Sequence, residues 1–143
     1  MTPDQIVLLR RSIDGLRPHS EQAAALFYGR LFEMLPEVRP LFTEDMVEQG
    51  RKLMRTLVAV MNGIDDMRSL RPAVERLGQR HLQYGVRQEH YEPVGVALIW
   101  ALEQGLGDAF TPDTRSAWLK AYDVLTQIML DAAGNPEAAE PAP

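Results

Sequence analysis

The chain has 143 residues and a mass of 16.1 kDa, which is the size of one domain that can bury a core without cross-links. It contains no cysteine, and this excludes disulfides, zinc fingers, iron–sulfur clusters and thiolate-ligated metals. Fifteen basic and twenty acidic residues give a net charge of −5, which is not the basic balance typical of nucleic-acid-binding proteins.

No targeting segment or membrane span is predicted. The start of the chain carries Asp4 and Asp14, and its only apolar run is Ile6–Leu9, which is too short for a secretory signal. The longest apolar run, Val94–Leu102, is about half of the roughly twenty residues that a membrane span needs. We therefore expect a soluble, cytoplasmic protein.

Helical periodicity begins at the first residues. Thr2-Pro3-Asp4 supplies a cap, a first-turn proline and an acid at the positive end of the dipole, and this helix should end near Arg17-Pro18. A second helix is predicted from Ser20 to the residue before Pro36. The residues expected to face inward are Ile6, Leu9, Ile13 and Leu16, then Ala24, Phe27, Tyr28, Leu31, Phe32 and Leu35.

The middle of the chain predicts two more helices. Two prolines within Pro36–Thr43 predict a turn or a single helical turn, and a helix follows from about Glu44 to Asn62. Gly63–Ser69 is interpreted as a loop, and the next helix is expected from about Leu70 to Gly85. The inward residues are Gln49, Leu53, Leu57, Val60 and Ile64, then Val74, Leu77, His81 and Tyr84.

Two long helices complete the prediction. One covers about Glu89–Leu106, and Thr111-Pro112-Asp113 opens another that ends at Gly134-Asn135-Pro136. No segment shows the period-2 alternation of a strand, so residues 1–133 should form an all-α domain of six to seven helices. Residues 134–143 are rich in Pro, Ala and Glu and are predicted to be a disordered tail. The inward residues of the last helix are Trp118, Ala121, Tyr122, Leu125, Ile128, Met129 and Ala132.

The three histidines are the candidate metal ligands. His19, beside a proline between two helices, is expected to face solvent, and His90 has no histidine partner at helical spacing. His81 lies on an apolar stripe, where it is either a core histidine or a lone axial ligand of a haem iron through Nε2, its Nδ1–H donating to the Leu77 carbonyl. Spacing alone leaves both interpretations open. HExxH, Glu-x-x-His, GxGxxG and GxxxxGK[ST] are all absent, so zinc, di-iron and nucleotide sites lack support.

Tyr28 and Gln49 are polar residues at positions where their helices otherwise bury carbon. Considered singly, Tyr28 is interpreted as a large core residue with its hydroxyl at the rim of the core. Gln49 is interpreted as a surface residue near the start of a helix. Taken together, they are two hydrogen-bond donors that could converge on one small ligand.

Five segments in order resemble bacterial single-domain globins and the globin domains of flavohaemoglobins, over about residues 3–133. The resemblance implies a globin fold, with helices packed around a haem pocket. The five segments are Phe27–Phe32, Pro36–Phe42 (PEVRPLF), Glu48–Met54, His81–Val86 with His90-Tyr91, and Ala117–Tyr122.

The same resemblance assigns roles to single residues. It makes His81 the proximal ligand of a haem b, with Tyr91 behind it, and non-covalent haem suits a chain without cysteine. It makes Tyr28 and Gln49 the distal donors to bound O₂. The residues expected to line an apolar haem pocket are Phe42, Leu53, Leu57, Leu77, Val86 and Val94.

Lys52 and Arg80 are expected at the rim of the pocket, paired with haem propionates, although each can also be interpreted as a solvated basic side chain.

The chain departs from the flavohaemoglobin pattern at two positions. Ala133 occupies the position at which the flavohaemoglobin pattern has a buried glutamate that joins the proximal histidine and tyrosine. Asp131, two residues away, would face elsewhere on the helix. Gly50 replaces a common proline, which suggests a looser start to its helix.

The resemblance implies reversible binding of O₂, NO and CO, and oxygen transport or NO detoxification as the role. Nitric oxide dioxygenase turnover would need an external reductase, because 143 residues leave no room for a reductase domain. A monomer or weak homodimer is expected. The alternatives are a haem-free globin-fold interaction module and a sensor, and the sensor would need a partner for its output.

Overall fold

The computed structural model describes residues 1–134 and places only helices in them, which confirms the all-α prediction. Within these described residues, six α-helices carry the fold, and four short 3₁₀ helices (η) join them. In chain order they are α1 (Pro3–Leu16), η1 (Arg17–His19), α2 (Ser20–Met34), η2 (Pro36–Leu41), α3 (Met46–Gly63), α4 (Met67–Gln83), η3 (Gln88–His90), α5 (Tyr91–Leu106), η4 (Gly107–Ala109) and α6 (Pro112–Gly134).

The start signals of the first and last helices are confirmed by their hydrogen bonds. At α1, the Gln5 amide donates to Thr2 Oγ1 at 3.1 Å, and the Thr2 amide donates to the Gln5 side chain at 3.0 Å. At α6, the Thr114 amide donates to Thr111 Oγ1 at 3.2 Å. Each threonine therefore satisfies a backbone donor that the first turn leaves without a helical partner.

Helix α4 begins earlier than predicted, at Met67 rather than near Leu70, so the loop assigned to Gly63–Ser69 is wrong. The physical reason is a cap at Asp66. Its carboxylate accepts from the Ser69 amide at 3.3 Å and from the Ser69 hydroxyl at 2.8 Å.

The C-terminal end of α4 corrects a second expectation. Tyr84 was placed on the inward face, but it follows the last helical residue and is 63% exposed. The next residue, Gly85, has a φ of +94°, a left-handed conformation that glycine adopts at low cost. The helical face therefore ends one turn earlier, at His81.

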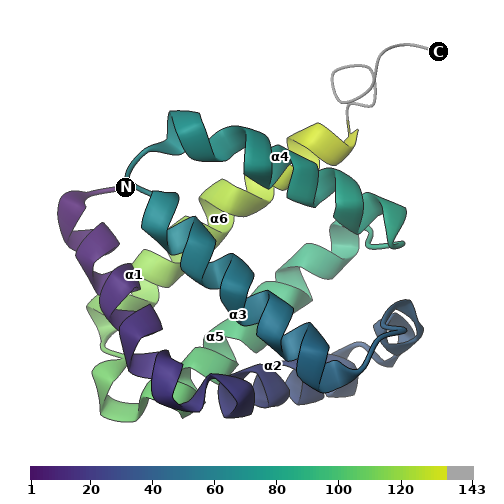
Figure 1. Ribbon diagram of the computed structural model, residues 1–143, viewed down its shortest axis with the longest axis horizontal. Coiled ribbons are helices and arrows are strands. Elements are labelled where there is room, and N and C mark those ends of the chain that lie inside the picture. Colours follow the sequence, from purple (N-terminus) through teal and green to yellow (C-terminus); the bar gives the residue numbers. More distant parts are fainter. Residues whose placement is uncertain (135–143) are drawn as a thin grey trace.

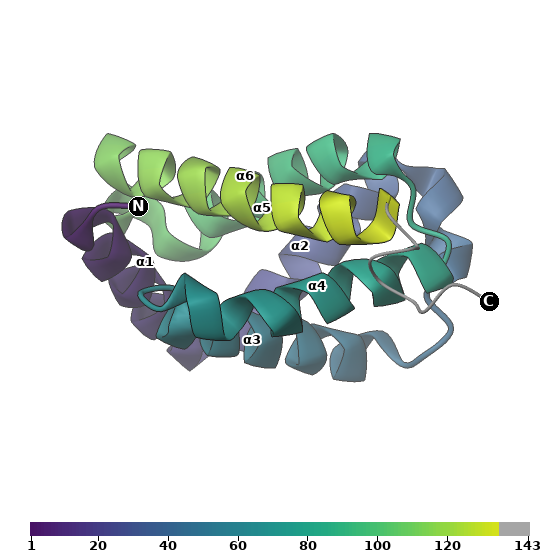
Figure 2. The ribbon, with the colours of Figure 1, turned by 90° about the horizontal axis from the view of Figure 1, so that it is seen from above.

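The helices form two layers. In Figure 2, α5 and α6 lie on one side of the molecule and α3 and α4 on the other. In Figure 1, α3 crosses in front of α5, and α2 runs along one edge, where it packs against both α5 and α3. Helix α4 packs against α6, and α1 joins the two layers through contacts with α3 and α6.

Trp118 of α6 is the largest side chain in the core, and only 1% of it is exposed. Around it lie apolar side chains from α1, α2, α3 and α5. At Gly78 the backbones of α4 and α6 nearly touch, because a Cβ there would lie 2.4 Å from the Met129 carbonyl oxygen. The direction of α4 is therefore fixed by direct backbone packing.

Between residues 1 and 134, no helix is long and apolar enough to cross a membrane. Gly134, where the predicted tail was to start, is the last residue of α6. The rest of that predicted tail, 135–143, lies outside the described residues.

Candidate functional site

His81 lies in the last turn of α4, and its Nδ1 lies 2.7 Å from the Leu77 carbonyl oxygen. Burial lowers the pKa of His81, and the bond to the Leu77 carbonyl opposes this shift. The neutral ring therefore carries its proton on Nδ1 and donates it to Leu77. Nε2 keeps its lone pair and makes no hydrogen bond within residues 1–134.

Tyr91, the first residue of α5, lies beside His81 with the two ring centroids 6.4 Å apart. Burial raises the pKa of the Tyr91 phenol. The Tyr122 hydroxyl donates to the Tyr91 backbone carbonyl and ties the start of α5 to α6. Together, α4, α5 and α6 fix the surroundings of the His81 ring.

No carboxylate joins His81 and Tyr91 among the residues that the structure describes. Asp131 is exposed and accepts a hydrogen bond from the Gln127 side chain at 3.0 Å, so it faces elsewhere, as expected from its helical position. Ala133 is half-buried and has no group that could accept a proton from the ring.

Tyr28 and Gln49 come together from α2 and α3, with Gln49 Nε2 donating to the Tyr28 hydroxyl oxygen at 3.3 Å. Burial raises the pKa of Tyr28, and the bond from Gln49 opposes this shift. Because Tyr28 accepts from Gln49, its own O–H remains available as a donor. Phe42 stands edge-on to the Tyr28 ring, with the centroids 5.3 Å apart, and adds apolar surface beside that ring.

The six apolar residues predicted to line the pocket share one property: every one is partly exposed rather than fully buried. Phe42, Leu53 and Val94 pack against the cluster that contains Tyr28. Leu77 and Val86 pack against the cluster that contains Tyr91. The sixth, Leu57, packs against the main core beside Leu53.

The two basic residues predicted at the rim differ in their contacts. Lys52 Nζ lies 2.5 Å from Oε2 of Glu44, which precedes α3, and the Lys52 side chain is half exposed. Arg80 is exposed and forms no ion pair within residues 1–134. Arg80 is thus the less constrained of the two.

The other two histidines have structural partners. His19 was expected to face solvent, which is wrong: it is half-buried, and its Nε2 lies 2.8 Å from the Gly105 carbonyl oxygen. That carbonyl belongs to the end of α5, which the sequence could not place beside η1. His90 is buried and accepts from the Arg87 amide at 3.0 Å through Nδ1.

The described part of the chain contains no group of three or more His, Cys, Asp or Glu side chains that could hold a metal ion. A metal bound at His81 Nε2 would therefore need most of its ligands from a non-protein group. A porphyrin would supply those ligands as ring nitrogens, and His81 would hold its iron. Together with the half-covered apolar residues, this donor set fits a haem.

A small apolar cavity of about 20 Å³ lies between α1, α2, α3 and α5. Leu53 and Leu57 are part of its wall, so it adjoins two of the predicted pocket residues. The cavity has the size of about one water molecule, but its carbon lining offers that water no hydrogen-bond partner. The complete wall is Leu16, Ala23, Ala24, Phe27, Leu53, Met54, Leu57, Leu98, Ala101 and Leu102.

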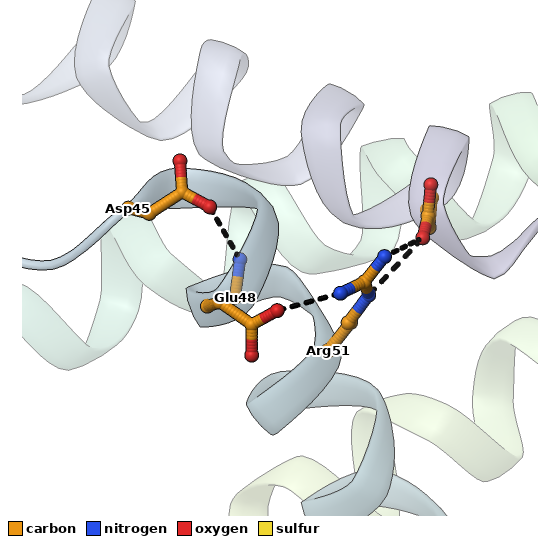
Figure 3. A network of polar contacts seen from close by, with 4 residues as sticks. Asp45, Glu48 and Arg51 are labelled. Atoms are coloured by element: carbon orange, nitrogen blue, oxygen red, sulfur yellow. Dashed lines mark hydrogen bonds and ion pairs between the residues drawn. The ribbon is translucent and has the colours of Figure 1, made fainter.

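Sequence reasoning missed the contact between Ala24 and Gly50. It expected Gly50 to loosen the start of α3, but Gly50 is buried against α2, and a Cβ there would lie 2.9 Å from the Ala24 Cβ. The helix start is capped by Asp45, whose carboxylate accepts from the Glu48 amide at 3.3 Å (Figure 3). Small residues on both helices were the signal that could have revealed this contact.

Comparisons with known proteins agree with this geometry. The sequence profile of the globin family matches residues 25–129. The chain is 33% identical over 130 residues to a flavohemoprotein of Bacillus subtilis, covering 87% of this chain and 32% of that protein. It thus spans about a third of the length of the curated relatives it matches.

Two solved structures are similar over nearly the whole chain. One is an engineered carbene transferase, a candidate nitric oxide dioxygenase from Rhodothermus marinus, with 32% identity, a TM-score of 0.84 and 97% of each chain covered. The other is a bacterial globin from Campylobacter jejuni, with 26% identity, a TM-score of 0.82 and 96% and 99% of the two chains covered. The chain therefore belongs to the globin family of haem-binding proteins and is homologous to the globin domains of flavohemoproteins.

Proposed function

We propose that this chain holds a haem b without a covalent bond, through Nε2 of His81, and binds O₂ reversibly, with NO and CO as further ligands. The observation that carries this proposal is the hydrogen bond from His81 Nδ1 to the Leu77 carbonyl at 2.7 Å. It fixes the tautomer that leaves the Nε2 lone pair available and holds the ring in one orientation.

The haem iron, when bound, supplies an open coordination position for a diatomic ligand. On the side of the haem where this ligand binds, the role of the protein is to donate hydrogen bonds. The Tyr28 hydroxyl and the Gln49 amide can both donate to partial negative charge on O₂. At about 1–2.5 kcal/mol for each donor, the pair would stabilise the ligand by about 2–5 kcal/mol and make its release slow.

The apolar residues around these donors are proposed to keep water away from the ligand. Phe42 and Leu53 contribute carbon on the Tyr28 side, and Leu77 and Val86 contribute carbon on the His81 side. By excluding water and protons, these residues would favour reversible binding over oxidation of the haem. Arg80 would bind a haem carboxylate at the rim of the pocket. Lys52 would bind one as well if its ion pair with Glu44 is exchanged for this new partner.

We further propose that the physiological reaction is conversion of NO to nitrate, in which NO, O₂ and one electron give one nitrate ion. The similarity to flavohemoproteins and to the candidate nitric oxide dioxygenase of R. marinus supports this assignment. The electron would come from a reductase. Ala133 at the glutamate position disfavours peroxidase-like chemistry, because no carboxylate there increases electron donation by the histidine.

The haem assignment is tested by absorption spectroscopy of the purified, haem-reconstituted protein. We expect a Soret band in the wild-type protein and its loss after desalting of the His81→Ala variant. His19→Gln is the matched control, because His19 bonds to Gly105 and should leave haem content unchanged. Equal haem content in the His81→Ala variant would contradict the proximal assignment, and a colourless reconstituted wild type would favour a haem-free interaction module.

The reaction is tested by stopped-flow mixing of the oxygen complex with NO. Rapid formation of nitrate is expected in a single turnover, and repeated turnover is expected only when a reductase and its reductant are added. An oxygen complex that does not consume NO would leave oxygen binding or sensing as the role.

A further inference from the structure

Helices α2 and α3 cross at one point, where three consecutive residues of α3 each face a different turn of α2. The first contact is polar and belongs to the proposed ligand site, and the second is a close approach of small residues. The third is an ion pair of Arg51, whose side chain is drawn in Figure 3. The three pairs are Gln49 with Tyr28, Gly50 with Ala24, and Arg51 with Glu21.

The middle contact determines how closely the helices approach. A Cβ added to Gly50 would lie 2.9 Å from the Ala24 Cβ. Two carbon atoms in contact normally lie about 3.5–4.0 Å apart. In this chain, with Ala24 opposite, a Cβ added at position 50 would therefore push α3 away from α2 by about 0.6 Å or more, or force an equivalent shift of Ala24.

The neighbouring hydrogen bond between Gln49 and Tyr28 would not survive such a shift. Gln49 Nε2 and the Tyr28 hydroxyl oxygen are already 3.3 Å apart, near the upper limit for a hydrogen bond. A widening of about 0.6 Å would take them beyond about 3.5 Å, where the hydrogen bond is lost. The two donors would then no longer converge on one small ligand.

We propose that Gly50 is a positioning residue for the ligand site: by allowing α3 to approach α2 at Ala24, it sets the separation between Tyr28 and Gln49. This inference rests on the proposed function, in which these two side chains hold O₂. Because position 50 carries no side chain, both donors can act together on one ligand.

The central experiment compares Gly50→Ala with Gly29→Ala. Gly29 follows Tyr28 on α2, and a Cβ there meets nothing within 4 Å, so the same chemical change is made without crowding. In the Gly50→Ala variant we expect O₂ to dissociate about tenfold faster, as loss of one donor worth about 1.4 kcal/mol predicts. In the Gly29→Ala variant the dissociation rate should equal that of the wild type.

Two spectroscopic measurements report on the contact itself. The nuclear Overhauser effect between the Gln49 side-chain amide and the Tyr28 ring, measured in the diamagnetic CO complex, should weaken in Gly50→Ala and persist in Gly29→Ala. The C–O stretching frequency should rise in Gly50→Ala, because bound CO loses a hydrogen-bond donor. A change in global stability alone would move neither signal.

A compensating variant tests the cause. Ala24→Gly combined with Gly50→Ala moves the methyl group from one helix to the other and removes the crowding. We expect this double variant to recover the O₂ dissociation rate and the Gln49–Tyr28 signal of the wild type. Recovery would exclude a simple loss of folding as the explanation for the single variant.

The inference is overturned if a folded Gly50→Ala protein keeps the wild-type rate and spectra, or if the double variant stays as altered as the single one. The proposed function fails differently, through absence of a Soret band in the wild type. In that case the Gln49–Tyr28 signal, measured in the haem-free protein, still shows whether Gly50 sets this separation.

Discussion

Gly78 of α4 lies directly against the backbone of Met129 in α6, so closely that an added Cβ would be 2.4 Å from the Met129 carbonyl oxygen and 2.6 Å from its Cα. Backbone atoms cannot rotate away as the end of a side chain can. His81 follows Gly78 by three residues on the same helix and so inherits its position from this contact.

Replacing Gly78 with Ala is expected to lower the free energy of unfolding by about 1–3 kcal/mol, because α4 must move away from α6. Urea denaturation checks this value. The same variant should lose haem faster than the wild type, since the helix that carries His81 is displaced. Gly29→Ala is the control, and equal stability of the two variants would show that α4 accommodates the methyl group.

Replacing Tyr28 with Phe removes one donor and keeps the ring that packs against Phe42. We expect the O₂ dissociation rate to rise about tenfold, which corresponds to about 1.4 kcal/mol. Tyr84→Phe, at an exposed position, is the control and should not change the rate. An unchanged rate in Tyr28→Phe would assign ligand stabilisation to Gln49.

Stability at alkaline pH should depend on Tyr122, whose pKa burial raises from 10.0 to about 12. The folded protein keeps the phenol proton where the unfolded chain loses it, so unfolding releases a proton between about pH 10 and pH 12. The Tyr122 contribution to stability is therefore complete below pH 10 and is lost as the pH rises to about 12. Comparing denaturation of the wild type and Tyr122→Phe across this window should show a shallower decline in the variant. Parallel declines would refute the assignment.

Arg51 bridges Glu21 on α2 and Glu48 on its own helix, at 2.9 Å and 2.6 Å (Figure 3). All three side chains are about half exposed or more, so water and salt weaken the pairs. Arg51→Gln should lower the melting temperature slightly at low salt and not measurably at about 1 M salt, where the Debye length is about 3 Å. A large loss that persists in high salt would mean that Arg51 stabilises the protein through packing of its side chain and not through these ion pairs.

Much of the fold could be predicted from the sequence because its signals are local. The Thr2 and Thr111 caps, the apolar stripes and the stop at Gly85 all act within one or two helical turns. The start of α4 was missed because Asp66 gives no apolar signal and acts only as a cap. His19 was misplaced because its partner, the Gly105 carbonyl, is 86 residues away along the chain.

The candidate site could be predicted in its residue types and in the local bond from His81 Nδ1 to the Leu77 carbonyl, but not in the contacts between its helices. A polar residue on an apolar stripe marked His81, Tyr28 and Gln49 individually. Their separation depends on how closely helices pack, and that depends on Gly50, whose role is the absence of a side chain. Periodicity records which residues face inward, but it holds no information about the distance between two helices.

The acceptor for His81 Nδ1 is a main-chain carbonyl, that of Leu77. No substitution at position 77 removes that oxygen, so the electron donation of this imidazole is protected from single point mutations at its partner. A change of acceptor must therefore come from a new side chain, and Ala133 on α6 stands at the position where the resemblance to flavohaemoglobins implies a glutamate. Ala133→Glu would test whether one added acid gives the proposed haem site stronger oxidation chemistry.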